Sequence, residues 1–228
     1  MVGCVNMFPA VIFDWDGTLA DSKDVIIDAF QKVLTDIGVF IDDEFIEKRI
    51  GIGPRNEFME IFKTENIPFD EALFTELQKK KIEIQLTQTG RVILLEGAKD
   101  LLDSLQGKVK MALATMSNRE VIDKLLLEKG MAGYFDVVIS VDEVVKPKPD
   151  PEIFLKSALK LGFPPERCAV VEDSIFGVLA AKEAKMKCIA VATGAYSAED
   201  LAKYSPDLLV RSLKEKDPIL RFLLDNNQ

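Results

Sequence analysis

Ala10-Val-Ile-Phe-Asp14-Trp-Asp16-Gly-Thr-Leu-Ala-Asp21 is the stretch around which the rest of this 228-residue chain is organised. Its apolar run ends in two aspartates separated by one residue, and Gly17 follows directly. A short apolar run bounded by such a turn signal is typical of a buried parallel strand. Ligands bind at the carboxyl ends of strands in open α/β sheets, which makes Asp14 and Asp16 candidate site residues. Taken alone, they could equally be turn residues.

The composition excludes several classes of protein. A net charge of −9 argues against nucleic acid or an anionic membrane as the main partner. The apolar runs are far shorter than the roughly 18 residues of a membrane span, and residues 1–9 lack the basic and apolar regions of a signal peptide. We therefore expect a cytoplasmic monomer or small homo-oligomer with no membrane partner.

Cysteine and histidine content narrows the chemistry further. Cys4, Cys168 and Cys188 are widely spaced and odd in number, which indicates free thiols in a reducing compartment. The chain has no histidine. A Ser-His-Asp triad, a His-ligated zinc ion and a phosphohistidine are therefore excluded, and the nucleophile, acid and base must come from other side chains.

The periodicity of the sequence divides the chain into two parts. Helical spacing without a convincing strand extends from about residue 22 to 88, with Pro54 and Pro68 each opening a helix. After it, apolar runs alternate with helical segments, which predicts a doubly wound, Rossmann-like parallel sheet. The expected strands lie at 109–115, 137–141, 168–171, 189–192 and 208–210. We therefore predict an α/β core of residues 1–21 and 90–228, with an all-helical cap of residues 22–89 inserted after the first strand.

Hydroxyl and amide side chains follow the second predicted strand of the core. Thr115 ends this strand, and Ser117 and Asn118 come directly after it. A hydroxyl at this edge of the sheet could bind a phosphate oxygen. Any of the three side chains could instead cap the helix that begins near Arg119.

Lys146 lies in the segment Val144-Val-Lys-Pro-Lys-Pro-Asp150. Its two prolines restrict the backbone of the loop, so a lysine there could present a fixed charge to phosphate. We expect Lys146 to do so because it directly follows an apolar stretch. Lys148 is expected to be solvated.

Glu172 and Asp173 follow the predicted strand at 168–171. They could be acidic neighbours of a helix N-terminus, which the helix dipole favours. Alternatively, they form a second acidic patch at the sheet edge that carries Asp14 and Asp16. Four carboxylates gathered at one edge would repel one another without a cation, and Mg²⁺ is held by carboxylates together with substrate phosphate.

Together these stretches resemble the four motifs of the haloacid dehalogenase superfamily of phosphotransferases. In order they are Asp14-x-Asp16-Gly-Thr18, Thr115, Lys146 in Lys-Pro-x-Pro-Asp, and Glu172-Asp173-Ser174. The core resemblance covers about residues 8–21 and 90–212. The helical insertion resembles the cap of the branch that contains phosphoglycolate phosphatase and β-phosphoglucomutase.

The resemblance implies a role for each motif residue. Asp14 would be the nucleophile that forms an aspartyl-phosphate, and Asp16 would act as acid and then as base. The implied Mg²⁺ ligands are Asp14, the backbone carbonyl of Asp16, and Asp173, with Glu172 as a further ligand. The implied phosphate contacts are Thr115, Lys146, Gly17, Ser117 and Asn118.

The implied activity is Mg²⁺-dependent hydrolysis of a small phosphorylated metabolite. Asp16 argues against dehalogenation, because the dehalogenases of the superfamily lack this second aspartate. A sugar-phosphate mutase of the β-phosphoglucomutase type is the alternative, and a non-catalytic binding protein on the same fold is a third possibility. The mutases carry a histidine near the position of Ile26, and its absence here favours hydrolysis.

The substrate contacts of the cap are less defined by the sequence. Arg55 could contact a substrate anion or be solvated in the first turn of a helix. Trp15 could line the leaving-group pocket or pack in the core. Lys79-Lys-Lys81 is expected to be a solvated helix face from which one side chain could reach the cleft. Ser22 and residues 90–95 are the expected hinges.

Overall fold

The strands of the core form a single parallel sheet in the computed structural model, which describes residues 8–225. They are β1 (Ala10–Phe13), β4 (Lys110–Ala114), β5 (Val137–Ile139), β6 (Cys168–Glu172), β7 (Lys187–Val191) and β8 (Leu208–Val210). Their order in the sheet is β5-β4-β1-β6-β7-β8, and each neighbouring pair is parallel. The predicted doubly wound sheet is therefore confirmed. The strand order reverses at β1, which places the first motif at the position where such sheets bind ligands.

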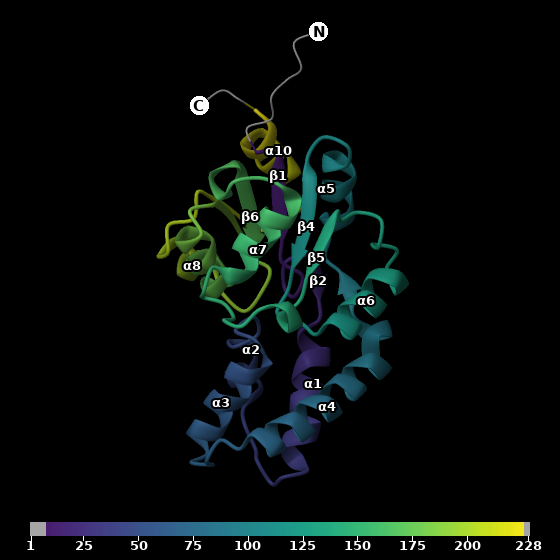
Figure 1. Cartoon of the computed structure of the whole chain (residues 1–228), viewed down its shortest axis with the longest axis vertical. Coiled ribbons are helices and arrows are strands. Elements are labelled where there is room, and N and C mark those ends of the chain that lie inside the picture. The colour runs from purple at the N-terminus through teal and green to yellow at the C-terminus, as the bar shows by residue number, and fades with distance from the viewer. Residues whose placement is uncertain (1–7, 226–228) are drawn as a thin grey trace.

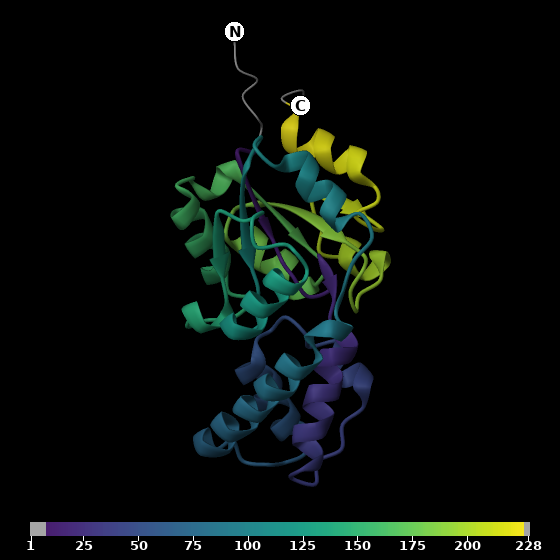
Figure 2. The same ribbon diagram turned by 90° about the vertical axis from the view of Figure 1, so that its right-hand side faces the viewer.

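Helices cover both faces of this sheet (Figures 1 and 2). One face carries α5 (Ala98–Leu105), α6 (Arg119–Glu128) and α10 (Lys216–Leu224), and the other carries α7 (Glu152–Leu161), α8 (Ile175–Glu183) and α9 (Ala198–Ala202). Successive side chains of a strand point to opposite faces. Val11 and Phe13 accordingly pack under the first group, and Ala10 and Ile12 pack under the second. Two buried layers thus hold β1 rigidly.

The register of β1 aligns the motif residues. Phe13 pairs with Leu113 of β4 on one side and with Val171 of β6 on the other. The next residue of each strand therefore lies at the same level, so that Asp14 is flanked by the ends of β4 and β6. The segments that carry Thr115 and Asp173 leave the sheet at this same edge.

The cap is a separate helical layer below the sheet in Figure 1. It contains α1 (Lys23–Thr35), α2 (Asp43–Glu47), α3 (Pro54–Thr64) and α4 (Glu71–Gln88). Its own buried cluster includes Phe30, Phe58 and Phe62, and the Phe30 and Phe58 ring centroids are 5.0 Å apart. Because α1 to α4 bury apolar side chains against one another, the inserted cap has a core of its own.

The chain crosses between core and cap twice, and the two crossings pair with each other. β2 (Ala20–Asp21) and β3 (Ile93–Leu94) form a short antiparallel sheet, with Ala20 opposite Leu94. Figure 2 shows the two segments side by side between the layers. This pairing of the two connections is a feature that the sequence did not indicate.

Two of the three cysteines fall within the described part of the chain. Cys168 on β6 and Cys188 on β7 are buried free thiols, and burial raises the pKa of each above its ordinary value. Cys4 lies outside the described residues. None of the helices within residues 8–225 has the length and apolar character needed to cross a bilayer.

Candidate active site

Asp14 stands at the centre of the site, directly after β1. Its side chain is buried, and its Oδ1 accepts a hydrogen bond from the Lys148 ammonium at 2.6 Å. The same ammonium lies 2.6 Å from Oε1 of Glu172, at the end of β6. The Lys148 side chain has no exposed surface. A buried lysine thus binds two carboxylates that come from neighbouring strands.

The expectation for the two lysines of the proline-rich loop is therefore wrong. Lys146 has 72% of its side chain exposed and pairs with Asp150 at 3.8 Å, whereas Lys148 is the lysine in the site. Pro147 and Pro149 flank Lys148 on both sides, and proline fixes the local backbone. Lys146 also precedes a proline, so the sequence alone does not distinguish the two lysines.

Glu172 and Asp173 have different surroundings. Both oxygens of Glu172 are engaged, because Oε1 receives Lys148 and Oε2 accepts from the backbone N–H and the hydroxyl of Ser174 at 2.8 and 2.9 Å. Oδ1 of Asp173 accepts from the Thr18 hydroxyl at 2.8 Å. Within residues 8–225, no group donates a hydrogen bond to Oδ2 of Asp173 or to Oδ2 of Asp14. These two aspartates therefore each keep an open oxygen.

The carboxylates of Asp14, Glu172 and Asp173 fit a divalent cation. Oxygens of all three lie within 4.8 Å of one another, and the three residues are buried. Mg²⁺ takes oxygen ligands from one or two carboxylates, and the open oxygens of Asp14 and Asp173 match this requirement. Glu172 already accepts hydrogen bonds from Lys148 and Ser174 on its two oxygens, so it is better suited to hold Lys148.

Glycines leave room for the Asp173 carboxylate. A Cβ atom on Gly194 would lie 1.7 Å from its Oδ2, and a Cβ atom on Gly17 would lie 2.3 Å from the same oxygen. Gly17 also has a φ of +81°, which side chains other than hydrogen rarely allow. The carboxylate therefore occupies space that only glycine provides at both positions.

The pKa values of these groups follow from their burial. Burial raises the pKa of Asp14 and of Asp173 well above the ordinary value, and the negative charge of Glu172 adds to both shifts. Burial alone would lower the pKa of Lys148, but Asp14 and Glu172 outweigh it and raise that pKa. With one lysine between three carboxylates, the cluster retains excess negative charge, which a bound cation would neutralise.

Asp16 points toward the cap and is held by hydroxyl groups. Ser22 donates to its Oδ1 at 2.5 Å, and Ser117 donates to its Oδ2 at 2.8 Å. The Thr115 hydroxyl lies 3.3 Å from Oδ2 and accepts the backbone N–H of Ser117 at 3.0 Å. Thr115 and Ser117 thus contact Asp16 of the first motif, and Ser22 links Asp16 to the connection between core and cap.

The other expected phosphate contacts have partners within the protein. The Gly17 N–H donates to the Ala20 carbonyl at 2.8 Å. The Asn118 amide donates to Asp142 at 2.9 Å, and its oxygen accepts from Gln78 of α4 at 2.6 Å. Asn118 is therefore a contact between core and cap as well as a neighbour of the site.

Trp15 and Arg55 do not reach the site. Trp15 is fully buried among the apolar residues of the core, which agrees with the packing alternative. Arg55 binds Glu71 through two guanidinium nitrogens and stacks over the ring of Phe69, with its charge 4.9 Å from the ring centroid. It is an exposed residue that ties α3 to the start of α4.

Three hollows meet at Asp16. One lies on the Asp173 side and has Ser22, Thr193 and Tyr196 in its wall. A second lies under the cap and includes Ser117, Glu57 and Lys81. The third lies beneath α1 and is mostly apolar. Asp16 is thus the group of the first motif that faces the space between cap and core.

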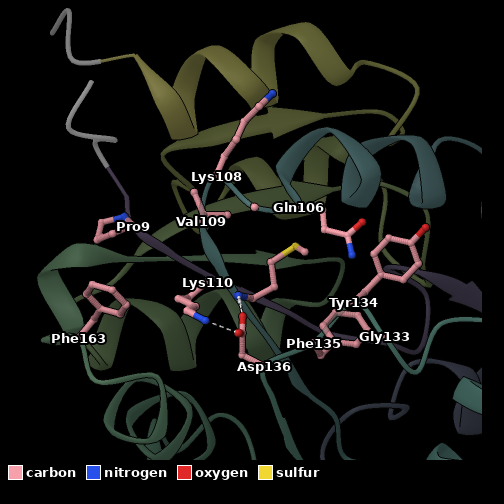
Figure 3. A pocket seen from close by; sticks show the side chains of 12 residues that line it. Pro9, Gln106, Lys108, Val109, Lys110, Gly133, Tyr134, Phe135, Asp136 and Phe163 are labelled. Atoms are coloured by element: carbon pink, nitrogen blue, oxygen red, sulfur yellow. Dashed lines mark hydrogen bonds and ion pairs between the residues drawn. The ribbon is translucent and has the colours of Figure 1, made fainter. Parts of the chain in front are cut away.

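A wider hollow of about 460 Å³ lies at the opposite edge of the sheet (Figure 3). Pro9 precedes β1 there, and Lys110 begins β4. Asp136 also lines this hollow, but its carboxylate is already paired with Lys110 at 2.5 Å and accepts a hydrogen bond from the Met111 N–H at 2.9 Å. The hollow contains none of the motif residues, so size alone does not locate the active site.

Glu57 is a polar residue of the cleft that the sequence did not single out, whereas Lys81 is the one lysine of Lys79-Lys-Lys81 that reaches the cleft instead of being solvated. Both are buried, with 6% and 5% of their surface exposed. The sequence offered a weak signal for Lys81, since Gln78, Lys81 and Gln85 share one face of α4. A polar stripe of this kind is indistinguishable from a solvated face until the neighbouring domain is known.

The geometry defines an α/β protein with a helical cap and a buried acidic cluster at the sheet edge, and comparison with known proteins gives its family. Residues 11–191 match the family model described as haloacid dehalogenase-like hydrolase. The chain belongs to this family and is a hydrolase of the branch that includes phosphatases and β-phosphoglucomutase-like proteins.

Individual relatives cover most of the chain. A phosphorylated carbohydrates phosphatase of Thermotoga maritima is 34% identical over 79% of this chain and 83% of its own. Fructose-1-phosphate phosphatase YqaB of Escherichia coli is 30% identical over 81% of this chain and 96% of its own. The crystal structure of β-phosphoglucomutase from Clostridium difficile superposes with a TM-score of 0.84 at 27% identity, covering 94% of this chain and 96% of that one.

Proposed function

We propose that the protein is a Mg²⁺-dependent phosphatase that hydrolyses small phosphate monoesters through an aspartyl-phosphate on Asp14. The observation that carries this proposal is the position of Asp14, whose Oδ1 is fixed by buried Lys148 while its Oδ2 is open. A carboxylate with one oxygen anchored and the other free has the geometry of a positioned nucleophile.

In the first step, Oδ2 of Asp14 attacks the phosphorus and the ester oxygen leaves. Lys148 keeps the carboxylate oriented and places a positive charge beside the incoming phosphoryl group. Phosphoryl transfer depends mainly on positioning and on neutralising charge. The hydroxyls of Thr115 and Ser117, which lie at the same edge and now bond Asp16, would donate hydrogen bonds to the phosphoryl oxygens.

Asp16 gives a proton to the leaving alcohol and later takes one from the water that attacks the aspartyl-phosphate. Its position at the meeting point of the three hollows supports this role, since both the leaving group and water can approach it. The Ser22 and Ser117 hydroxyls fix the direction of its carboxylate. General acid–base catalysis requires such hydrogen-bond reach.

Asp173 would hold Mg²⁺ through its open oxygen, together with the carboxylate of Asp14 and the backbone carbonyl of Asp16. When bound, the ion neutralises negative charge on phosphate and carboxylates. Glu172 holds Lys148 between the strands and thereby keeps a cation next to Asp14.

Hydrolysis is favoured over the mutase reaction by two residues of the cap. Ile26 lines the hollow beneath the cap, at the position where the resembling mutases carry a histidine. Arg55, the counterpart of the mutase phosphate contact, is engaged with Glu71 instead. The proposed compartment is the cytoplasm, which suits the buried free thiols of Cys168 and Cys188.

Phosphate release from a panel of small monoesters, with and without Mg²⁺, tests the proposal. Wild-type protein is expected to release phosphate only with Mg²⁺, and Asp14→Asn is expected to lose at least a thousandfold because it lacks the nucleophile. Full turnover by Asp14→Asn would refute the covalent intermediate. Undiminished activity in excess chelator would refute the metal requirement.

A further inference from the structure

Helix α7 carries an apolar stripe on the outside of the core. Its Ile153, Phe154 and Ala158 side chains are buried against the sheet. Leu155 and Leu159 lie one turn apart on the other side of the helix, and 38% and 78% of their surface is exposed. Figure 1 shows α7 in front of the sheet. The helix therefore buries one side in the core and leaves two leucines on the side that faces solvent.

The loop before α7 extends this stripe. Val145 has 86% of its surface exposed, and its backbone N–H bonds the Glu152 carboxylate at 3.1 Å, which holds Val145 beside the first turn of α7. An open hollow of about 360 Å³ lies alongside, with Lys146, Leu155 and Leu159 in its wall. We call Val145, Leu155 and Leu159 together the α7 face.

The α7 face has the composition of a contact surface. Eight large apolar side chains are exposed within residues 8–225, and three of them gather here. Exposed apolar side chains that gather in one place mark sites of interaction, whereas a single exposed leucine, such as Leu127 of α6, needs no such explanation. The hollow gives the side chains of another protein chain a place to enter.

The charges around the α7 face are balanced, unlike those of the whole chain. Three ion pairs surround it: Lys146 with Asp150 at 3.8 Å, Lys156 with Glu152 at 2.6 Å, and Lys160 with Glu143 at 2.6 Å. The whole chain has a net charge of −9. The face therefore neither attracts a strongly charged partner nor repels a second copy of this acidic chain.

The charges of α7 are also ordered along the helix. Glu152 lies in its first turn and Lys160 in its last turn, with Leu155 and Leu159 between them. When the same helix of a second copy lies antiparallel, the acidic end of each helix meets the basic end of the other. A two-fold interface requires a surface that is its own complement in this way.

We propose that the α7 face binds a second copy of this chain, forming a two-fold symmetric dimer in which the two α7 helices pack antiparallel. The symmetry axis passes between Leu155 and Leu159, so that Leu155 of each copy contacts Leu159 of the other. Glu152 of each copy then lies near Lys160 of the other, and Val145 extends the contact at both ends.

The size of the α7 face sets the strength of the dimer. A helix of ten residues is about 15 Å long. Such a helix and one loop provide less than the roughly 800 Å² that each partner buries in a stable interface of standard size. We therefore expect a reversible dimer with a dissociation constant on the order of 10–100 µM.

Sedimentation velocity at rising protein concentration tests the proposal. Wild-type protein is expected to change from monomer to dimer between about 1 and 300 µM. Leu159→Glu is expected to raise the dissociation constant at least about tenfold, because it places two charges in the apolar centre of the contact. Leu127→Glu, the same exchange at a leucine of α6 that is 75% exposed, is the matched control and should dimerise like the wild type.

A second pair of variants tests the charge complementarity. Lys160→Glu replaces an opposite charge by a like charge near Glu152 of the second copy, at two symmetry-related positions. The dissociation constant should rise about fivefold or more, and the difference from wild type should shrink at high salt. Lys79→Glu changes the net charge equally at an exposed position of the cap and should leave the dissociation constant unchanged.

Cysteine cross-linking tests the antiparallel arrangement. In a Cys4→Ser background, Leu155→Cys and Leu159→Cys proteins are mixed with a mild oxidant. The mixture should form a disulfide-linked dimer at least about tenfold faster than either protein alone, since the proposed symmetry places position 155 opposite position 159. Cys168 and Cys188 do not compete, because both are buried.

The results that overturn the proposal are distinct from these. A wild type that remains a monomer at the highest concentration overturns it, and so does a dimer that Leu159→Glu and Lys160→Glu do not weaken, because its interface then lies elsewhere. Equal weakening by Leu127→Glu or Lys79→Glu, or equal cross-linking in the mixed and separate proteins, also overturns it. Circular dichroism and thermal melting establish that each variant is folded.

Discussion

Two buried lysines, one in the core and one in the cap, have opposite surroundings. Lys148 contacts Asp14 and Glu172 at 2.6 Å each, and the two carboxylates raise its pKa above the ordinary value. Lys81 has no carboxylate in contact within the described residues, and burial lowers its pKa, with Glu57 and Asp16 opposing the shift. One lysine is satisfied by the protein itself, and the other lacks a partner.

This difference distinguishes a lysine of the catalytic cluster, Lys148, from a lysine of the cap, Lys81. Lys148 is fixed by residues at the ends of two neighbouring strands, so its position is the same whatever ester is bound. Lys81 lies on a helix of the cap, and its ammonium contacts the Phe30 ring. Substitution of Lys148 should therefore affect every substrate, whereas substitution of Lys81 leaves the cluster of Asp14, Glu172 and Lys148 intact.

The largest effect is expected for Lys148→Met. Removal of this charge leaves Asp14 and Glu172 buried side by side without a cation, and breaking a buried pair costs about 3–5 kcal/mol of stability. Loss of charge beside the phosphoryl group should also lower kcat about 10²–10³-fold on every ester. Thermal melting and phosphate release would measure the two effects.

Lys146→Met is the matched control for Lys148→Met. Lys146 is two residues away in the same loop, and its exposed ion pair contributes little to stability. A loss of activity in Lys146→Met as large as that in Lys148→Met would contradict the assignment. Lys148→Arg, which keeps the charge, should recover stability better than activity, and this remains measurable even where Lys148→Met does not fold.

A smaller effect is expected for Gly194→Ala. The new Cβ atom would clash with Asp173 Oδ2 and displace the Asp173 carboxylate from its present position. The concentration of Mg²⁺ needed for half-maximal activity should rise about tenfold or more, because ligand geometry sets the affinity. Titration of activity with Mg²⁺ measures this shift. Gly133→Ala, in open space at the other edge of the sheet, should leave the titration unchanged.

The last effect concerns the cap and appears as a pH dependence of stability, with activity unchanged as the expected companion result. Because the pKa of Glu57 rises from 4.5 to about 7 on folding, its contribution to stability is complete at low pH and is lost as pH rises through 7. The rise corresponds to about 3 kcal/mol. Relative to Glu57→Gln, the wild type should lose this amount between pH 4.5 and pH 8 in urea unfolding. If the free energies of unfolding of the wild type and of Glu57→Gln changed with pH by the same amount, a buried Glu57 with a raised pKa would be contradicted.

Much of the fold could be predicted because its signals are local. The apolar runs at 10–13 and 168–171 have the length and turn boundaries of buried parallel strands, and both lie in the central part of the sheet. The predicted helix start at Pro68 is wrong by three residues. Helix α4 begins at Glu71, because Asp70 caps it by accepting a hydrogen bond from the Leu73 N–H. The helices α9 and α10 and the pairing of β2 with β3 carried no comparable pattern.

The site could be predicted in part for a related reason. Asp14, Asp16 and Asp173 follow strands, so topology alone gathers them at one edge. Lys148 reaches the same edge from a loop, and only the path of that loop decides which lysine turns inward. Glu57 and Lys81 depend on how the cap lies against the core, which is a long-range property that helical periodicity does not contain.

The pairing of β2 with β3 makes the cap an exchangeable module. Paired strands lie about 4.8 Å apart, so the chain leaves the core and returns to it at almost the same point. The entropy of closing an insertion grows only slowly with its length, and the sheet edge therefore places little constraint on what is inserted between Asp21 and Ile93. Shorter, longer or differently shaped caps can be grafted onto these two strands, with the nucleophile and its lysine left in place.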